Sequence, residues 1–360
     1  MKDRLSQSEL KSALRSNIQR AGWSLCIGAG TSLPIFPDWS DLIRSLILKV
    51  ECNNGNINSM WDDLLRRYNP DSILQAAYNI MSINDDKFSR LLSGLLYEKL
   101  ESRLTPSEFK VVTKILSLTG PEGAGDKEWK LFINVREKHF KTITAYDLAK
   151  VVWESSKCYK GPKEILSFNA ETLMYALINS FIYEDHLAQR KSRGDRPKRL
   201  LDFINRSIST KRTGRIQYIF NHGLLPIPNY EKKVLQWAAD KLVFKEEKYL
   251  QLANMSFTWQ ASEFINICSS RPVVFIGVSL SDSNMRRWLT WVQENRRNEI
   301  ASAGGNQRTS TRHFWITKAP EQDMQKGWLE ACVFHLGIRV LWITEWTEVG
   351  NILREAIGIS

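Results

Sequence analysis

The sequence predicts an α/β fold: a Rossmann-like, doubly wound, mostly parallel sheet with a helical insertion. Several short apolar runs read as buried strands, and apolar residues at helical spacing lie between them. Strands that alternate with helices form a parallel sheet that is covered on both faces. The runs lie at residues 25–27, 165–168, 216–220, 273–277, 313–317 and 338–343. About six strands is the usual size of such a sheet.

The first predicted strand leads directly into a glycine turn. Leu25-Cys26-Ile27 is followed by Gly28-Ala29-Gly30 and the hydroxyls of Thr31 and Ser32, and then by a helical pattern that includes Leu42 and Ile43. Strand, glycine turn and helix is the arrangement that brings backbone N–H groups to a phosphate in open α/β sheets. The third glycine of the dinucleotide fingerprint is absent, so this stretch alone predicts a nucleotide site and an ordinary turn equally.

The middle of the chain is helical and predicts a separate unit. After a break at 53–56, helical patterns continue through a helix that starts at Pro70-Asp71 and a capping box at 105–108. We therefore expect two units. Residues 1–56 and 161–360 form the Rossmann-like domain, and residues 57–160 form a helical insertion or cap.

Four predicted strands end in polar groups that a core does not need. Thr31 and Ser32 follow the first run, Asn169 and Glu171 the second, His222 the third, and 277–282 the fourth. Each group has a structural alternative, since Asn169 and Asp282 suit helix caps and a histidine before glycine suits a turn. Because ligands of parallel sheets bind at the carboxyl ends of strands, the four ends together favour a site.

Composition limits the class of protein and its location. Apolar residues make up 43% of the chain, yet no run approaches the roughly 20 residues of a membrane helix. The amphipathic N-terminus lacks the apolar centre of a signal peptide. Five scattered cysteines, at 26, 52, 158, 268 and 332, argue against a disulfide framework and a Cys₄ zinc site. We expect a cytoplasmic protein without membrane contact or bound metal.

The charge is basic, with a formal net value of +11. Part of the excess lies at 190–215, where ten Lys and Arg residues stand against two acids. A solvated loop and helix face is the favoured interpretation, and a surface for nucleic acid or a protein partner is the alternative.

Five segments carry a family resemblance, and the last of them matches over a span too long for easy coincidence. They are GAGTS at 28–32, Pro37-Asp38-Trp39, SFNAETL at 167–173, FNHG at 220–223 and VVFIGVSLSDSNMRRWL at 273–289. In these the chain resembles the sirtuin-like superfamily, and most of all the bacterial branch that hydrolyses NAD+ in antiphage defence. The resemblance covers about 20–50 and 160–360. It departs at Ala170, where the family has an aromatic residue, and at Glu171, where it has aspartate.

The resemblance implies roles for particular residues. Asn169 and His222 would be catalytic, with the amide positioning the ribose and water and the imidazole serving as general base. Phe36 and Trp39, beside Asp38, would cover the nicotinamide. The remaining residues would bind the dinucleotide: Gly28, Ala29, Gly30, Thr31 and Ser32 at the diphosphate, Glu171 as an orienting group, and Gly277, Ser279 and Asp282 at the adenosine-side ribose.

The resemblance also implies an activity and partners. The chain has no Cys-x-x-Cys pair, so it lacks the structural zinc of the protein deacylases, and hydrolysis of NAD+ to nicotinamide and ADP-ribose is favoured. A deacylase or ADP-ribosyltransferase, and a non-catalytic nucleotide-binding module, are the alternatives. A toxic hydrolase needs restraint, so we expect a homo-oligomer and a separately encoded sensor or activator, an ATPase or an Argonaute-like protein.

Overall fold

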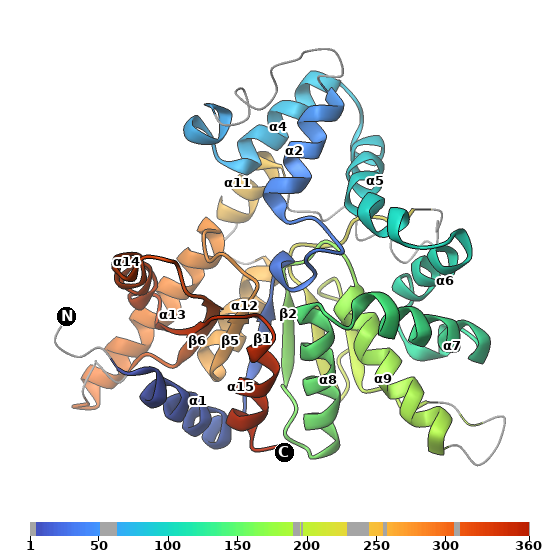
Figure 1. The fold of residues 1–360 in the computed structure, drawn as a ribbon. Coiled ribbons are helices and arrows are strands. Elements are labelled where there is room, and N and C mark those ends of the chain that lie inside the picture. Colours follow the sequence, from blue (N-terminus) through green and yellow to red (C-terminus); the bar gives the residue numbers. More distant parts are fainter. Residues whose placement is uncertain are drawn as a thin grey trace.

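Seven parallel strands form one sheet in the order β3-β4-β2-β1-β5-β6-β7 (Figure 1). This computed structural model describes residues 5–50, 63–189, 195, 197–228, 245–254, 258–305 and 310–359. The strands are β1 (Ser24–Ile27), β2 (Glu164–Ser167), β3 (Leu201–Ile204), β4 (Ile216–Phe220), β5 (Val273–Ile276), β6 (His313–Lys318) and β7 (Ile338–Ile343). The predicted Rossmann-like α/β fold is confirmed.

The direction of winding changes at β1. The chain moves from β1 to β2 and on to β3 and β4 on one side, and then returns to β5, β6 and β7 on the other. Leu25 of β1 accordingly pairs with Ile165 of β2 and with Val274 of β5. A crevice opens at the carboxyl end of the strand where the order reverses. The fold therefore directs a ligand to the residues that follow β1.

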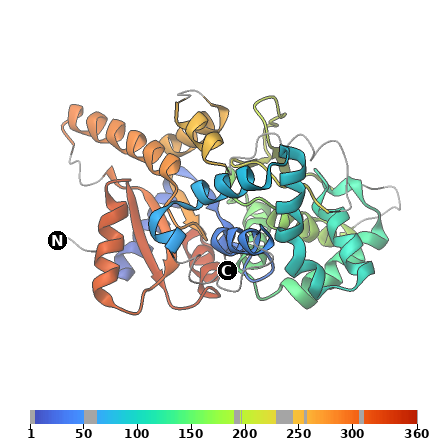
Figure 2. The same ribbon diagram turned by 90° about the horizontal axis from the view of Figure 1, so that it is seen from above.

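Helices cover both faces of the sheet (Figures 1 and 2), and β1 is buried on both faces as a result. Leu25 and Ile27 lie in one hydrophobic core, with α1 (Gln7–Ala21), α8 (Thr144–Lys157), α9 (Leu173–Gln189) and α15 (Glu348–Ile357). Cys26 lies in the other, with α12 (Trp259–Ser270) and α13 (Ser283–Ser302). Alternate residues of a strand point to opposite faces, so both cores meet at β1. Helix α14 (Asp323–Phe334) joins the second core through Val333.

β3 is a strand that the sequence prediction missed. Its run Leu201–Ile204 contains Asp202, which breaks the apolar pattern. Asp202 is buried, accepts a hydrogen bond from the backbone N–H of Arg212 and forms an ion pair with Arg215 at 3.2 Å. These two basic residues belong to the segment 190–215, of which 190–194 and 196 lie outside the described residues. Its described part thus has structural ion pairs, and its role in binding stays a prediction.

A group of helices lies beyond the carboxyl edge of the sheet. It includes α2 (Trp39–Val50), α4 (Pro70–Met81), α5 (Asp85–Arg103) and α11 (Glu246–Asn254), drawn above the strands in Figure 1. Helices α6 (Pro106–Leu116) and α7 (Asp126–Val135) follow α5 along the chain. Thr105 and Glu108 form the expected capping box at the start of α6. The N–H of Thr105 donates to Glu108 Oε2 at 2.9 Å, and the N–H of Glu108 donates to Thr105 Oγ1 at 3.3 Å. The predicted break at 53–56 lies outside the described residues.

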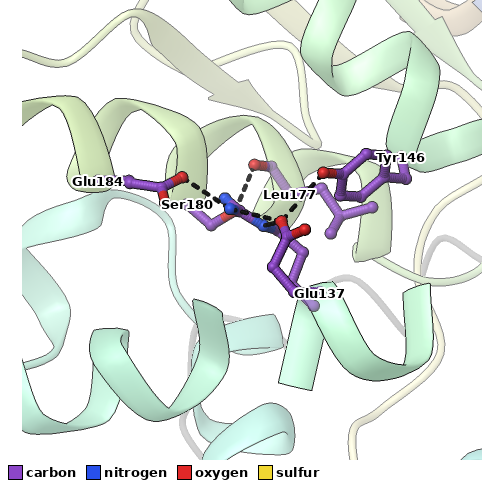
Figure 3. A network of polar contacts seen from close by, with 6 residues as sticks. Glu137, Tyr146, Leu177, Ser180 and Glu184 are labelled. Carbon is purple, nitrogen blue, oxygen red and sulfur yellow. Dashed lines mark hydrogen bonds and ion pairs between the residues drawn. The ribbon is translucent and has the colours of Figure 1, made fainter. Parts of the chain in front are cut away.

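A buried arginine joins this helical part to the helices beside the sheet. Figure 3 labels the surrounding residues Glu137, Tyr146, Ser180 and Glu184. Arg136, in a π-helical turn after α7, is 2% exposed. Its guanidinium donates to Ser180 Oγ at 3.0 Å and to Glu184 Oε2 at 2.6 Å, both on α9. Glu137 accepts from the same guanidinium and from Tyr146 of α8 at 3.0 Å. Because α8 also packs against α9 and α15, the division at residue 160 stays a prediction.

None of the described helices has both the length and the apolar character needed to cross a membrane.

Candidate functional site

The structure gathers the predicted site residues around one cavity of about 540 Å³ at the carboxyl ends of β1, β2, β4 and β5. This volume falls within the range of small-molecule sites. The lining includes Gly28, Ala29, Gly30, Ser32, Phe36, Asp38, Trp39, Asn169, Glu171, His222, Gly277, Ser279 and Asp282. Thr31 is the predicted residue that does not line the cavity. It is fully buried and donates through Oγ1 to the carbonyl of Gly28 at 2.8 Å.

Close contact between two loops explains the glycines. A Cβ on Gly28 would lie 2.6 Å from the carbonyl oxygen of Gly277. A Cβ on Gly30 would lie 3.0 Å from the Cα of Gly277. Gly277 itself has φ +67°, and a Cβ there would lie 2.6 Å from the backbone nitrogen of Thr31. The loop after β1 therefore packs on the loop after β5, backbone against backbone. The glycines meet this packing requirement whether or not a ligand is bound.

Most N–H groups of the glycine turn already have partners in the chain. Gly28 donates to Ile276, Gly30 donates to Gly277, and Thr31 and Ser32 donate to carbonyls within the turn, at 3.0–3.1 Å. A diphosphate would have to share or displace these bonds. Its predicted binding through the turn stays a prediction.

A polar network holds Asn169 in the cavity wall. The Nδ2 group of Asn169 donates to Glu171 Oε1 at 2.8 Å and to Ser32 Oγ at 3.3 Å, and Ser32 donates to the same carboxylate at 2.7 Å. The other Glu171 oxygen accepts from the N–H of Leu173 at the start of α9. The longer Glu171 side chain thus still reaches Asn169. Asn169 Oδ1 is buried and accepts no hydrogen bond from the described residues.

Burial raises the pKa of Glu171, which is 4% exposed, while the bonds from Ser32, Leu173 and Asn169 oppose the shift. These three donors favour the ionised form, to which all of them can donate. The side chain is therefore fixed from three directions and fixes Asn169 in turn.

His222 lines the cavity beside Asp282. Its Nε2 lies 3.3 Å from Asp282 Oδ2, and its ring meets the edge of Phe168 with centroids 4.6 Å apart. Asp282 Oδ1 accepts from the N–H of Met285 at 2.7 Å and so caps α13. The cap that the sequence allowed for Asp282 is present, and the same carboxylate also faces the histidine.

The segment 36–39 forms another wall. Phe36 is 1% exposed and packs edge-on against Tyr97 of α5, with ring centroids 5.1 Å apart. Asp38 Oδ1 accepts from the N–H of Asp41 at 2.8 Å in the first turn of α2. Trp39 is only partly buried and lines the cavity.

Asp71 is a lining residue that sequence reasoning assigned only to a helix start. It lies in the first turn of α4 and accepts a hydrogen bond from the side chain of Trp39. Burial and the nearby Asp282 raise the pKa of Asp71 to about 6, and His222 opposes the shift. No pattern along the chain points to it, because residues far apart in sequence create its surroundings.

The charged lining is acidic. Four carboxyl groups line the cavity, those of Asp38, Asp71, Glu171 and Asp282, and no Lys or Arg is among the described lining residues. The described part of the chain also holds no group of three or more His, Cys, Asp or Glu residues arranged for a metal ion.

Residues 184–336 match the family model of the SIR2-like domain. These residues are similar to a SIR2-like domain. The match spans β3, β4, β5 and β6 and includes His222 and 277–282, while the glycine turn and Asn169 lie before it. SIR2-like domains use NAD+, so the match supports an NAD-related function for this chain. No curated protein matches the chain.

Proposed function

We propose that this SIR2-like domain hydrolyses NAD+ to nicotinamide and ADP-ribose. The observation that carries the proposal is the state of Asn169. Its Nδ2 is held by Glu171 and Ser32, and its Oδ1 is a buried acceptor that the described residues leave unused beside the cavity. Buried polar atoms normally have partners. A ribose hydroxyl or the attacking water would supply one.

The reaction needs no acid at the leaving group. The bond between ribose C1′ and the pyridinium nitrogen breaks, and its electron pair neutralises the ring as nicotinamide leaves. The ribose gains oxocarbenium character, and Asn169 Oδ1 orients its hydroxyls or the incoming water. Water oxygen bonds to C1′ and gives up a proton. The products are ADP-ribose, nicotinamide and one proton.

His222 is the proposed acceptor of that proton. Asp282, 3.3 Å from Nε2, would stabilise the imidazolium that forms, and the edge of Phe168 limits rotation of the ring. A general base of this kind typically contributes about 10²–10⁴-fold to a rate. The segment 36–39 would cover the nicotinamide and exclude bulk water.

Release of nicotinamide from NAD+ by purified protein, with and without its activator, tests the proposal. Asn169→Ala and His222→Asn should each lower the rate at least about a hundredfold. Asn266→Ala and His335→Asn, at exposed positions on α12 and after α14, should leave it unchanged. Undiminished NAD+ loss in the two site variants would refute the assignment.

The biological role we propose is that of a toxic effector in antiphage defence. A free hydrolase would exhaust the NAD+ of its own cell, so its activity has to depend on self-assembly or on a separately encoded partner. An ATPase and an Argonaute-like protein are the expected kinds of partner. NAD+ loss that begins only when the product of a neighbouring gene is added would support this role, and constitutive NAD+ loss by the isolated chain would contradict it.

A further inference from the structure

Asp71 brings a charge into the site from outside the sheet. It lies in the first turn of α4 and lines the same cavity as His222 and Asp282, although α4 belongs to the helical part of the chain. Helix α4 is tied to a second helix by the bond from Ser72 Oγ to Glu246 Oε1 of α11, at 2.7 Å. The position of Asp71 is therefore set by helix packing over the strand ends.

The other carboxylates of the cavity are engaged by the protein. Asp38 caps α2, both oxygens of Glu171 accept hydrogen bonds, and Asp282 caps α13 while it faces His222. Asp71 has a different setting. The indole of Trp39 donates to it, and its charged neighbours are Asp282 and Glu246, which repel it, and His222, which attracts it.

A half-buried carboxylate is unfavourable where burial and repulsion by other carboxylates outweigh the attraction of a histidine, and such groups concentrate at functional sites. No Lys or Arg among the described lining residues compensates it. NAD+ supplies the missing charge, because its nicotinamide ring is a pyridinium cation while the rest of the molecule is anionic. Asp71 also contacts Trp39, in the segment that the proposed function places over this ring.

We propose that Asp71 recognises the cationic nicotinamide ring of NAD+, so that helix α4 supplies a specificity-determining residue to the site. The inference rests on the proposed function and deepens it. The carboxylate attracts the pyridinium in the bound substrate and loses this attraction once the ring leaves as neutral nicotinamide. Asp71 therefore selects the oxidised dinucleotide and favours release of the product.

Protonation governs this recognition. The pKa of Asp71 is raised to about 6, so the carboxylate is charged above that pH and neutral below it. The groups that face it are Trp39 from α2, His222 after β4, Asp282 at the start of α13 and Glu246 from α11. Affinity for a cationic ring should rise through pH 6, and affinity for a neutral ring should lack this rise.

The test compares three ligands by titration calorimetry of the full chain. Carba-NAD+ keeps the pyridinium and resists cleavage, NADH has a neutral ring, and ADP-ribose has none. Asp71→Asn, a neutral isostere, should lower the affinity for carba-NAD+ at pH 7.5 by about tenfold. It should change the affinities for NADH and ADP-ribose less than about twofold. At pH 5 the wild type and the variant should bind carba-NAD+ alike.

The matched control is Asp86→Asn. Asp86 occupies the first turn of another helix, α5, with its side chain 60% exposed and paired with Arg90 at 3.0 Å. It should leave all three affinities unchanged. If Asp71→Asn loses affinity for carba-NAD+ and NADH equally, or loses affinity for neither, the inference is overturned.

Failure of the proposed function has a different signature. If the wild type binds none of the three ligands, the NAD+ site itself is wrong, and Asp71 falls with it. If the wild type binds all three and releases nicotinamide, but Asp71→Asn keeps the preference for carba-NAD+, only the role of Asp71 is refuted.

Discussion

Replacing Asp71 with asparagine should make the protein more stable at neutral pH. The native pKa of about 6 lies above the ordinary value of 3.8, chiefly because of burial. Below pH 3.8 the group is protonated in both the native and the unfolded states. Between pH 3.8 and 6 the native state keeps a proton that the unfolded state releases, so the free energy of unfolding falls as pH rises.

The size of the effect follows from the shift. A difference of about two pKa units corresponds to about 3 kcal/mol at full ionisation. Asparagine avoids this cost and keeps an acceptor for Trp39. It loses the favourable interaction of a negative charge with the helix N-terminus, which is worth about 0.3–1 kcal/mol. A net gain of about 2 kcal/mol remains at pH 7.5, or about 3 °C in Tm for a chain of 360 residues.

Thermal unfolding by calorimetry, between pH 4 and 8, measures this gain. The difference between Asp71→Asn and the wild type should be small at pH 4, grow through pH 6 and then level off. Asp86→Asn should show no such rise, because Asp86 is exposed. A variant that is less stable than the wild type at pH 7.5, or a difference that does not vary with pH, would refute the reasoning.

Three further substitutions probe the fold around the site. Gly277→Ala places a Cβ 2.6 Å from the backbone nitrogen of Thr31, at a residue with φ +67°. Thermal stability should fall by about 1–3 kcal/mol, and carba-NAD+ affinity should fall with it. An unchanged melting curve would contradict the loop packing. Arg136→Met removes a buried guanidinium from two carboxylates and should cost about 2 kcal/mol in urea unfolding, and a neutral result would show that the network is dispensable. Burial lowers the pKa of His313 to about 3. Its contribution to the free energy of unfolding is therefore full above pH 6.5 and declines as pH falls toward 3. His313→Gln should make the acid side of the stability profile less steep, and an identical profile would disprove this.

Sequence pattern predicted much of the fold because one physical signal recurs in it. Six of the strands appear as apolar runs, since a strand buried on both faces must be apolar throughout. β3 was missed because Asp202 interrupts its run, and this residue is stable inside the protein only through its contacts with Arg212 and Arg215. Those partners lie ten and thirteen positions along the chain, beyond the reach of any local pattern.

The sequence by itself determined the α/β class and the order of polar strand ends that includes Asn169 and His222, because both depend on residue type and local spacing. Only the tertiary structure decided what surrounds these residues. It fixed Asn169 through Glu171, set Asp282 beside His222 and packed the two glycine loops together. It also brought Asp71 from a distant helix to the cavity and raised its pKa. Burial and electrostatic surroundings depend on residues that meet only when the chain folds, so no reading of neighbours along the sequence reveals them.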